Sequence, residues 1–139
     1  MIILIEDNTN DAELTKLALK KANIENEVKW LRDGADAVTF FREQIASDPS
    51  FIKNIRMAFL DLKMPKVSGF EVLETLRAIP ELVCMPIIVL SSSSVESDIR
   101  EVYKLGANSY IVKPINYKQH AKVIADAAGY WTEINKTLH

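Results

Sequence analysis

Short apolar runs alternate with longer stretches of helical spacing along the chain. The runs are rich in β-branched and aliphatic residues and occupy positions 2–5, 28–31, 57–60, 86–90 and 109–112. Each run is followed by a stretch in which apolar residues recur with the period of a helix; these stretches are 11–22, 35–46, 70–78, 96–105 and 117–138. The pattern therefore predicts a β-α unit repeated five times.

The apolar runs are continuous rather than alternating with polar residues, as in Ile87-Ile88-Val89-Leu90. Such strands suit a parallel sheet that helices cover on both faces. A chain of 139 residues is typical of a single domain, so we expect one domain over 1–139. The expected fold class is α/β: a doubly wound five-stranded parallel sheet, flavodoxin-like with strand order 2-1-3-4-5, and five helices. Asn8, Thr9 and Asn10 are candidate N-caps of the first helix.

Polar residues that carry chemistry follow four of the predicted strands. The set holds three acids, two hydroxyls and an amine: Glu6, Asp7, Asp61, Ser91, Ser92 and Lys113. In open parallel sheets the ligand site lies beyond the carboxyl ends of the strands. We therefore expect these side chains to gather at one edge of the sheet.

Clustered carboxylates repel one another at neutral pH, so the three acids need a cation, a basic side chain or bound protons to lie together. Oxygen ligands with room for water favour Mg²⁺. Beside a hard cation, a carboxylate can act as a nucleophile toward phosphorus, while an ammonium group neutralises charge on the phosphoryl oxygens. Asp61 and Lys113 fit these two roles.

Four motifs stand in register at the predicted strand ends. They are Ile3-Leu4-Ile5-Glu6-Asp7-Asn8, Asp61-Leu62-Lys63-Met64-Pro65 with Gly69, Leu90-Ser91-Ser92, and Lys113-Pro114. Each motif is commonplace alone, but the four in this order and spacing are specific. Together they resemble the receiver domains of two-component response regulators, and the resemblance covers essentially the whole chain.

The resemblance implies a role for each matching position. Asp61 would be the phosphoacceptor, taking a phosphoryl group from the phosphohistidine of a sensor histidine kinase. Mg²⁺ would be held by Asp7, Asp61 and the Lys63 backbone carbonyl, with Glu6, where an aspartate is frequent, nearby directly or through water. Lys113 would pair with the phosphoryl oxygens. Such a domain catalyses only its own phosphorylation and dephosphorylation, so we expect no conventional enzyme.

The resemblance also implies a switch that transmits the signal. Ser91, where threonine is commoner, would move inward to hydrogen-bond the phosphorylated acid, and Ser92 would contact the phosphate. Tyr110 would turn its ring inward and so alter a face built from the fourth helix, the fifth strand and the fifth helix. Tyr110 also has a competing interpretation as an ordinary core or edge residue. The Lys113–Pro114 bond is cis in the family, which would aim the lysine into the site.

The residues alone leave other functions to be weighed. A phosphatase that forms an aspartyl-phosphate usually has an acid two residues beyond the nucleophile, where this chain has Lys63. The complete set of acids, hydroxyl and lysine opposes a binding module that is never phosphorylated. The lack of a glycine-rich phosphate loop opposes a nucleotide or flavin protein. Asp61 could also be a loop or cap acid, but it stands between an apolar run and the turn at Met64-Pro65.

The composition of the chain limits the classes of binding partner and the cellular compartment that we expect. A net charge of −2 provides no basic field for a phosphate backbone, so nucleic acid is not expected as a direct partner. No apolar run approaches the roughly 20 residues of a membrane helix, and the first residues lack the basic start of a secretory signal, so a cytoplasmic protein is expected. Cys84 is alone and forms no internal disulfide. His120 and His139 are too few for a metal site and are expected to be exposed.

The chain is about as long as one receiver domain, so we expect no output domain and signalling through a downstream protein. The long connection 44–56, with Phe51 and Ile52, and the tail Gly129-Tyr130-Trp131-Thr132-Glu133-Ile134-Asn135 resemble single-domain regulators associated with phytochromes. The kinase would then be of the phytochrome type. Tyr130, Trp131 and Ile134 could form a symmetric homodimer face or could pack within the chain, and both interpretations stay open.

Overall fold

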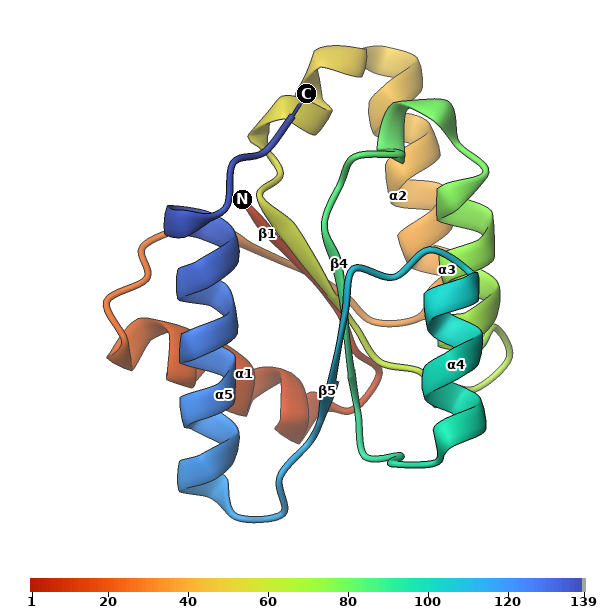
Figure 1. Ribbon diagram of the computed structural model, residues 1–139. Helices are drawn as coiled ribbons and strands as arrows, with labels where there is room; N and C mark the ends of the chain where they lie inside the picture. Colours follow the sequence, from red (N-terminus) through yellow and green to blue (C-terminus); the bar gives the residue numbers. More distant parts are fainter. Residues whose placement is uncertain (139) are drawn as a thin grey trace.

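The computed structural model describes residues 1–138 and confirms the predicted α/β architecture (Figure 1). Five parallel strands form one sheet in the order β2-β1-β3-β4-β5. Their bounds are β1 Ile2–Ile5, β2 Val28–Leu31, β3 Met57–Leu60, β4 Ile87–Ser91 and β5 Ser109–Val112. Four strands match the predicted runs, and β4 is shifted by one residue, so Ser91 ends the strand rather than following it.

Five α-helices lie within the described part of the chain: α1 Thr9–Lys21, α2 Gly34–Ser47, α3 Gly69–Arg77, α4 Glu96–Lys104 and α5 Tyr117–Gly129. Short 3₁₀ segments follow α2 at Pro49–Asn54 and α3 at Pro80–Leu82. The predicted end of the last helix is wrong, because α5 passes into a π-helical turn at Tyr130–Ile134 and the helix stops there. Ile134 and Leu138 are 68% and 78% exposed, so no packed face extends the helix further. None of the helices in residues 1–138 has the length and apolar character needed to cross a bilayer.

Helices cover both faces of the sheet, which explains the continuous apolar strands. Figure 1 shows α1 and α5 on one face and α2, α3 and α4 on the other. Alternate side chains go to alternate faces: Ile2 and Leu4 join the cluster under α1 and α5, whereas Ile3 and Ile5 join the cluster under the other three helices. Every residue of β1, β3 and β4 is buried. The central strands are thus held from both sides, which fixes the positions of the residues that follow them.

Gly69 marks the close approach of α3 to the end of β3. A Cβ at this position would lie 2.2 Å from the Asp61 backbone oxygen and 2.6 Å from the Leu62 Cα. Because backbone cannot give way as a side chain can, we expect Gly69→Ala to lower the free energy of unfolding by about 1–3 kcal/mol. Urea denaturation measures this change.

Gly129→Ala is the matched control for that substitution. Gly129 ends α5, and apart from its chain neighbours and the backbone of its own helix no described atom lies within 4 Å of an added Cβ. We expect this change to raise the free energy of unfolding by about 0.4–1 kcal/mol, because alanine restricts the unfolded chain. If both substitutions stabilised the protein, the close approach at Gly69 would not be the constraint that we infer.

Candidate functional site

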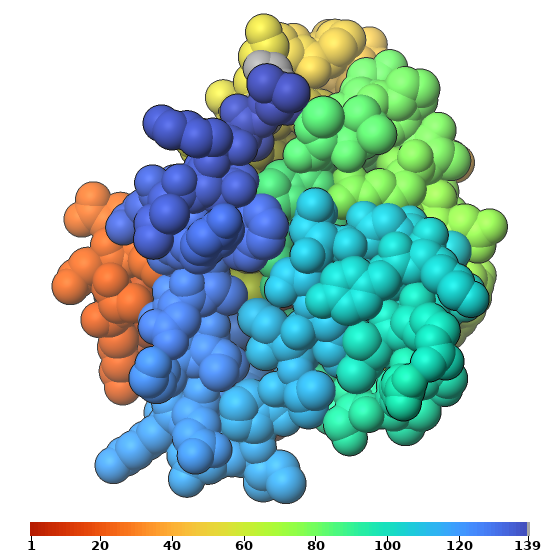
Figure 2. All heavy atoms as spheres, viewed as in Figure 1, coloured from red at the N-terminus to blue at the C-terminus, as the bar shows by residue number. Residues whose placement is uncertain are grey.

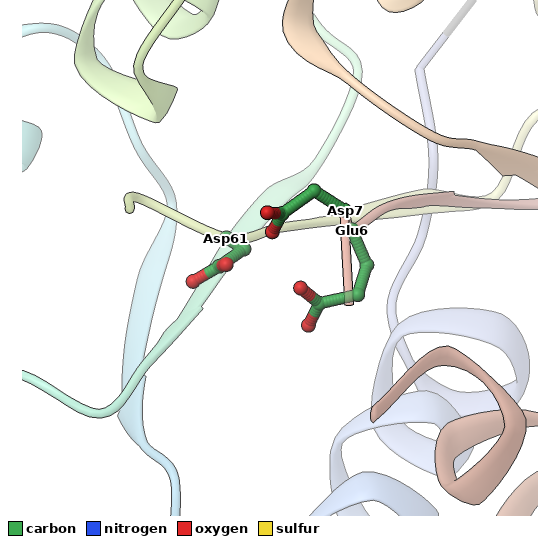
Figure 3. A group of neighbouring side chains, drawn as sticks. All are labelled: Glu6, Asp7 and Asp61. Atoms are coloured by element: carbon green, nitrogen blue, oxygen red, sulfur yellow. The ribbon is translucent and has the colours of Figure 1, made fainter. Parts of the chain in front are cut away.

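Three carboxylates lie together at the carboxyl ends of β1 and β3, and the Glu6 and Asp7 side chains extend to the side on which Asp61 lies (Figure 3). Ile5 pairs with Leu60, so the next residues, Glu6 and Asp61, emerge side by side. The Asp61 backbone N–H donates to the Ile5 carbonyl at 3.0 Å. Asp7 follows on the turn into α1, and one oxygen of each carboxyl group lies within 4.8 Å of the others. The structure therefore brings the three predicted acids together.

The turn that carries two of these acids is ordered by a helix cap. Asn8, one of the three cap candidates, is the N-cap of α1, and its side chain accepts the Asp11 backbone N–H at 2.9 Å. The Asn8 backbone N–H in turn donates to Glu6 Oε2 at 3.3 Å. Asn8 thus has two roles: its side chain caps the backbone at the start of α1, and its backbone N–H holds the Glu6 carboxylate in place.

Lys113 reaches the acidic group from the end of β5. Its backbone N–H donates to the Ser91 carbonyl at 2.7 Å, which ties the residue to the end of β4. The ammonium lies 2.8 Å from Glu6 Oε1, 3.1 Å from Asp11 Oδ2 and 3.8 Å from Asp61 Oδ1. The side chains of Lys113, Glu6 and Asp61 are at most 11% exposed, so water screens the pairs of Lys113 with Glu6 and Asp61 weakly. The predicted convergence of Lys113 on the acids is confirmed.

The Lys113–Pro114 bond is trans, because no cis peptide bond occurs in residues 1–138. The predicted cis bond is therefore wrong. An X-Pro bond favours the trans form by about 0.5–1 kcal/mol unless its surroundings oppose it. Here the long Lys113 side chain already hydrogen-bonds Glu6 with the trans backbone. The direction of the ammonium thus comes from the end of β5 and the reach of the side chain.

Burial has a large effect on the pKa values of Glu6, Asp61 and Lys113. Burial raises the pKa of Glu6 from 4.5 to about 7, and the hydrogen bond and charge of Lys113 offset only part of that rise. Burial also raises the pKa of Asp61, against the lowering effect of the Lys113 charge. For Lys113 burial acts to lower the pKa, but its hydrogen bond to Glu6 and the surrounding carboxylates outweigh this and raise it. The site thus favours added positive charge, and its oxygen donors are those that Mg²⁺ prefers.

The two predicted switch residues are joined through the loop between β4 and α4. Ser91 is fully buried, and its hydroxyl accepts the Ser93 backbone N–H at 3.2 Å. The Tyr110 hydroxyl donates to the Ser93 carbonyl at 2.8 Å, and its side chain packs against the core. The Ser93 hydroxyl donates to Asp98 at 2.7 Å and accepts the Val95 N–H at 3.2 Å. Ser93 is thus the contact that Ser91 and Tyr110 share.

The remaining predicted residues lie at the rim of the site. Ser92 is exposed and lines a hollow of about 260 Å³ together with Lys113 and Pro114. Lys63 is exposed, and a backbone hydrogen bond from it acts to lower the pKa of Asp61. The Lys63 carbonyl as a metal ligand stays a prediction.

Asp11 and Trp30 belong to the site but were not predicted from the sequence. Asp11 contacts Lys113. It lies in the first turn of α1, four residues after Asp7, and this acidic position close to the motif was a signal in the sequence that the motifs do not include. Trp30 on β2 donates its indole N–H to the Glu6 carbonyl at 2.7 Å. No pattern in the sequence links Trp30 to Glu6, because the contact depends on the pairing of β2 with β1.

His120 is buried, so the prediction that it is exposed is wrong. It is only 6% exposed rather than solvent-exposed, because α5 turns this residue toward α1 and the site. Burial and the Lys113 charge lower the pKa of His120, and its Nε2 is buried without a hydrogen-bond partner among the described residues. His139 lies outside the described residues.

Sequence comparisons place the chain among known proteins. It matches the response regulator receiver domain family over residues 2–125. It is 32% identical to the probable methanogenesis regulatory protein FilR2 of Methanothrix harundinacea, over 99% of this chain and 86% of FilR2. It is 35% identical to the response regulator Rcp1 of Synechocystis, over 96% of this chain and 89% of Rcp1.

Solved structures agree with these matches. The phosphorylated cyanobacterial phytochrome response regulator RcpA superposes with a TM-score of 0.89 at 32% identity, over 99% of this chain and 97% of RcpA. The Mn²⁺-bound form of Rcp1 superposes with a TM-score of 0.85 at 32% identity, over 99% of this chain and 98% of that one. Because family, motifs and fold agree over most of its length, the chain belongs to the response regulator receiver domain family of two-component signalling.

Proposed function

We propose that this receiver domain is a phosphorylation switch in which Asp61 accepts a phosphoryl group from the phosphohistidine of a sensor histidine kinase. The observation that carries the proposal is the single shielded ammonium of Lys113 among carboxylates at the carboxyl ends of β1 and β3. Response regulators work with sensor histidine kinases, and the similarity to RcpA, solved in its phosphorylated form, supports the proposal.

The chemistry is transfer of a phosphoryl group to a carboxylate. An Asp61 oxygen attacks phosphorus, and a P–O bond forms as the P–N bond to the donor imidazole breaks, leaving its electron pair on nitrogen. Lys113, now 3.8 Å from Asp61, neutralises charge on the transferred oxygens. In dephosphorylation water attacks the same phosphorus, which restores the carboxylate and releases inorganic phosphate. The domain turns over no separate metabolite.

The same acids are the proposed ligands of a divalent cation. Asp7, Asp61 and the Lys63 carbonyl would hold Mg²⁺, with Glu6 as a further ligand directly or through water. When bound, Mg²⁺ would neutralise charge on the carboxylates and the phosphoryl oxygens. The raised pKa values of Glu6 and Asp61 and the Mn²⁺-bound form of Rcp1 both support a cation at this position.

Ser91 and Tyr110 are the proposed switch residues. For Ser91 to bond the phosphoryl group, its hydroxyl must give up the Ser93 N–H. The Tyr110 hydroxyl is held by the carbonyl of the same residue, so a movement at Ser91 and the position of Tyr110 are coupled. Ser92 would contact the phosphoryl group from the rim. Phosphorylation shifts the population only as far as the active arrangement binds the new charge better.

The face built from α4, β5 and α5 is the proposed reading surface for a downstream protein. Val95, Tyr103 and Val112 are apolar or aromatic residues of α4, its cap and β5, and they are 55%, 49% and 41% exposed. Exposed apolar side chains next to a switch are typical of a protein contact. Figure 2 shows α4, β5 and α5 together on one side of the molecule.

The relatives suggest the source of the signal and a second contact. RcpA is a phytochrome response regulator, which supports a phytochrome-type kinase as the partner of this chain. At the end of α5, Trp131 packs against the core, whereas Tyr130 and Ile134 are 46% and 68% exposed. Trp131 thus serves packing within the chain, and Tyr130 and Ile134 are the proposed homodimer contact.

The test is intact-protein mass after incubation with a small acyl phosphate, in Mg²⁺ or in a chelator. We expect a gain of one phosphoryl group in Mg²⁺ and none in chelator, because the carboxylates and the transferred group need the cation. Sizing chromatography of the same samples shows whether phosphorylation changes self-association. If the mass stays constant in Mg²⁺, the chain either is a binding module or accepts the phosphoryl group only from its own kinase. Incubation with a phosphorylated sensor histidine kinase decides between the two, and no gain there contradicts the proposal.

A further inference from the structure

Lys113 contacts three carboxylates, and one of them, Asp11, has no role in the proposed phosphoryl transfer. Asp11 on α1 lies 3.1 Å from the ammonium, closer than Asp61 at 3.8 Å. Glu6 is the deep partner, with a side chain 4% exposed, whereas the Asp11 side chain is 38% exposed. The ammonium is therefore shared between a buried carboxylate and a second one at the rim.

Helix α1 does not need the Asp11 carboxylate for its own start. Asn8 supplies the cap and accepts the Asp11 backbone N–H. An acid in the first turn gains from the helix dipole, but any first-turn acid of any helix makes that contribution. The hydrogen bond from Lys113 to Asp11 Oδ2 is specific to this site.

The two partners compete with a phosphoryl group for the same donor. An ammonium has three N–H groups, and two hydrogen bonds from Lys113 go to Glu6 and to Asp11. A phosphoryl group on Asp61 would bring further negative charge and acceptor oxygens to the ammonium. We propose that Asp11 is a positioning residue that holds Lys113 in the unphosphorylated protein and competes with the phosphoryl group for it. This inference rests on the proposed function.

The charge of Asp11 acts in the same direction as its hydrogen bond. A carboxylate that close to Lys113 repels an anion that forms at Asp61 and also draws the ammonium away from it. Removing the charge should therefore strengthen the binding of a phosphoryl-like anion. If Asp11 instead aligned Lys113 for transfer, removing it would weaken that binding, so the sign of the effect decides between the two.

The test is the affinity of the Mg²⁺-loaded protein for beryllofluoride, a non-reactive analogue of the phosphoryl group. We expect Asp11→Asn to bind beryllofluoride roughly tenfold more tightly than wild type. This change in affinity is near the lower end of the range for coupled binding sites, because Asp11 is partly exposed and water screens its charge. Asp11→Glu keeps the charge and should stay close to the wild-type affinity. The Mg²⁺ affinity of each variant is measured without beryllofluoride. This measurement distinguishes a change in cation binding from a change in beryllofluoride binding.

Asp36→Asn is the matched control. Asp36 has the same place in α2 as Asp11 has in α1, and its backbone N–H likewise donates to its cap, Asp33, at 2.7 Å. This variant loses a first-turn acid without losing a contact to Lys113, so its beryllofluoride affinity should not change. Equal tightening in Asp36→Asn, or equal or weaker binding in Asp11→Asn, overturns the inference.

Failure of this inference is distinct from failure of the proposed function. If wild type gains a phosphoryl group but Asp11→Asn binds beryllofluoride no better than wild type, Asp11 is not a competitor and the switch stands. If wild type neither gains a phosphoryl group nor binds beryllofluoride, and Asp11→Asn does not either, both proposals are wrong.

Discussion

Asp61→Asn is expected to take up no phosphoryl group under conditions in which the wild-type protein gains one. An amide is not a nucleophile toward phosphorus, and the neighbouring acids are not placed to replace it, because Glu6 is held by Lys113 and by the cap at Asn8. Intact-protein mass with an acyl phosphate and Mg²⁺ measures the outcome. Asp36→Asn, which removes one exposed acid away from the site, should keep full uptake. A phosphoryl group that persists on Asp61→Asn would place the acceptor at another residue.

The same substitution is expected to stabilise the cation-free fold. Burial raises the pKa of Asp61 above that of the unfolded chain, so the folded protein binds this proton more tightly. The stability that this carboxyl contributes is therefore present at low pH and is lost as the pH rises through the folded pKa. Asparagine is neutral throughout and escapes that loss. In chelator we expect a higher melting temperature for Asp61→Asn than for wild type at pH 8, and a smaller difference at a pH below 3.8, where the carboxyl is protonated in both states.

If Asp61→Asn loses phosphoryl uptake but gains stability, Asp61 serves the chemistry of the site at a cost to the stability of the fold. A melting temperature at pH 8 that is equal to or below that of wild type would contradict the expected cost of ionising Asp61 in its buried site. It would show that Lys113, 3.8 Å away, compensates fully for burial.

Glu6 is expected to make stability strongly dependent on pH. Its pKa rises from 4.5 to about 7 on folding, because the side chain is buried. Between these values the folded protein keeps a proton that the unfolded chain has lost, so stability falls as pH rises from about 4.5 to about 7 and then levels off. A rise of this size in pKa corresponds to about 3 kcal/mol.

Glu6→Gln removes this titration and isolates it. In chelator, the unfolding free energy of Glu6→Gln minus that of wild type should grow by about 3 kcal/mol between acid and mildly alkaline pH, as measured by urea denaturation. The lowered pKa of His120 acts in the opposite sense, since its stability is lost as pH falls, but it is common to both proteins and cancels. A difference that stays constant with pH would show that Glu6 is ionised throughout.

The amino-acid sequence by itself determined the helices and strands and the edge of the sheet at which the site lies. Continuous apolar runs bounded by breaking residues are local features, so four of five strands have the predicted bounds and β4 is displaced by one residue. Parallel strands present their carboxyl ends at one edge, so the positions of Glu6, Asp7, Asp61 and Lys113 in the sequence were enough to predict that they meet. The order of the same motifs was enough to predict the family, which the comparisons confirm.

Tertiary structure alone decided which further side chains enter the site. Asp11, Trp30 and His120 reach it from α1, β2 and α5, and their approach depends on how each element is rotated and packed against the sheet. The trans bond before Pro114 and the end of α5 were decided in the same way. Periodicity encodes the face that a residue occupies on its own element, but contacts between elements depend on the packing of all of them together, which no local pattern contains.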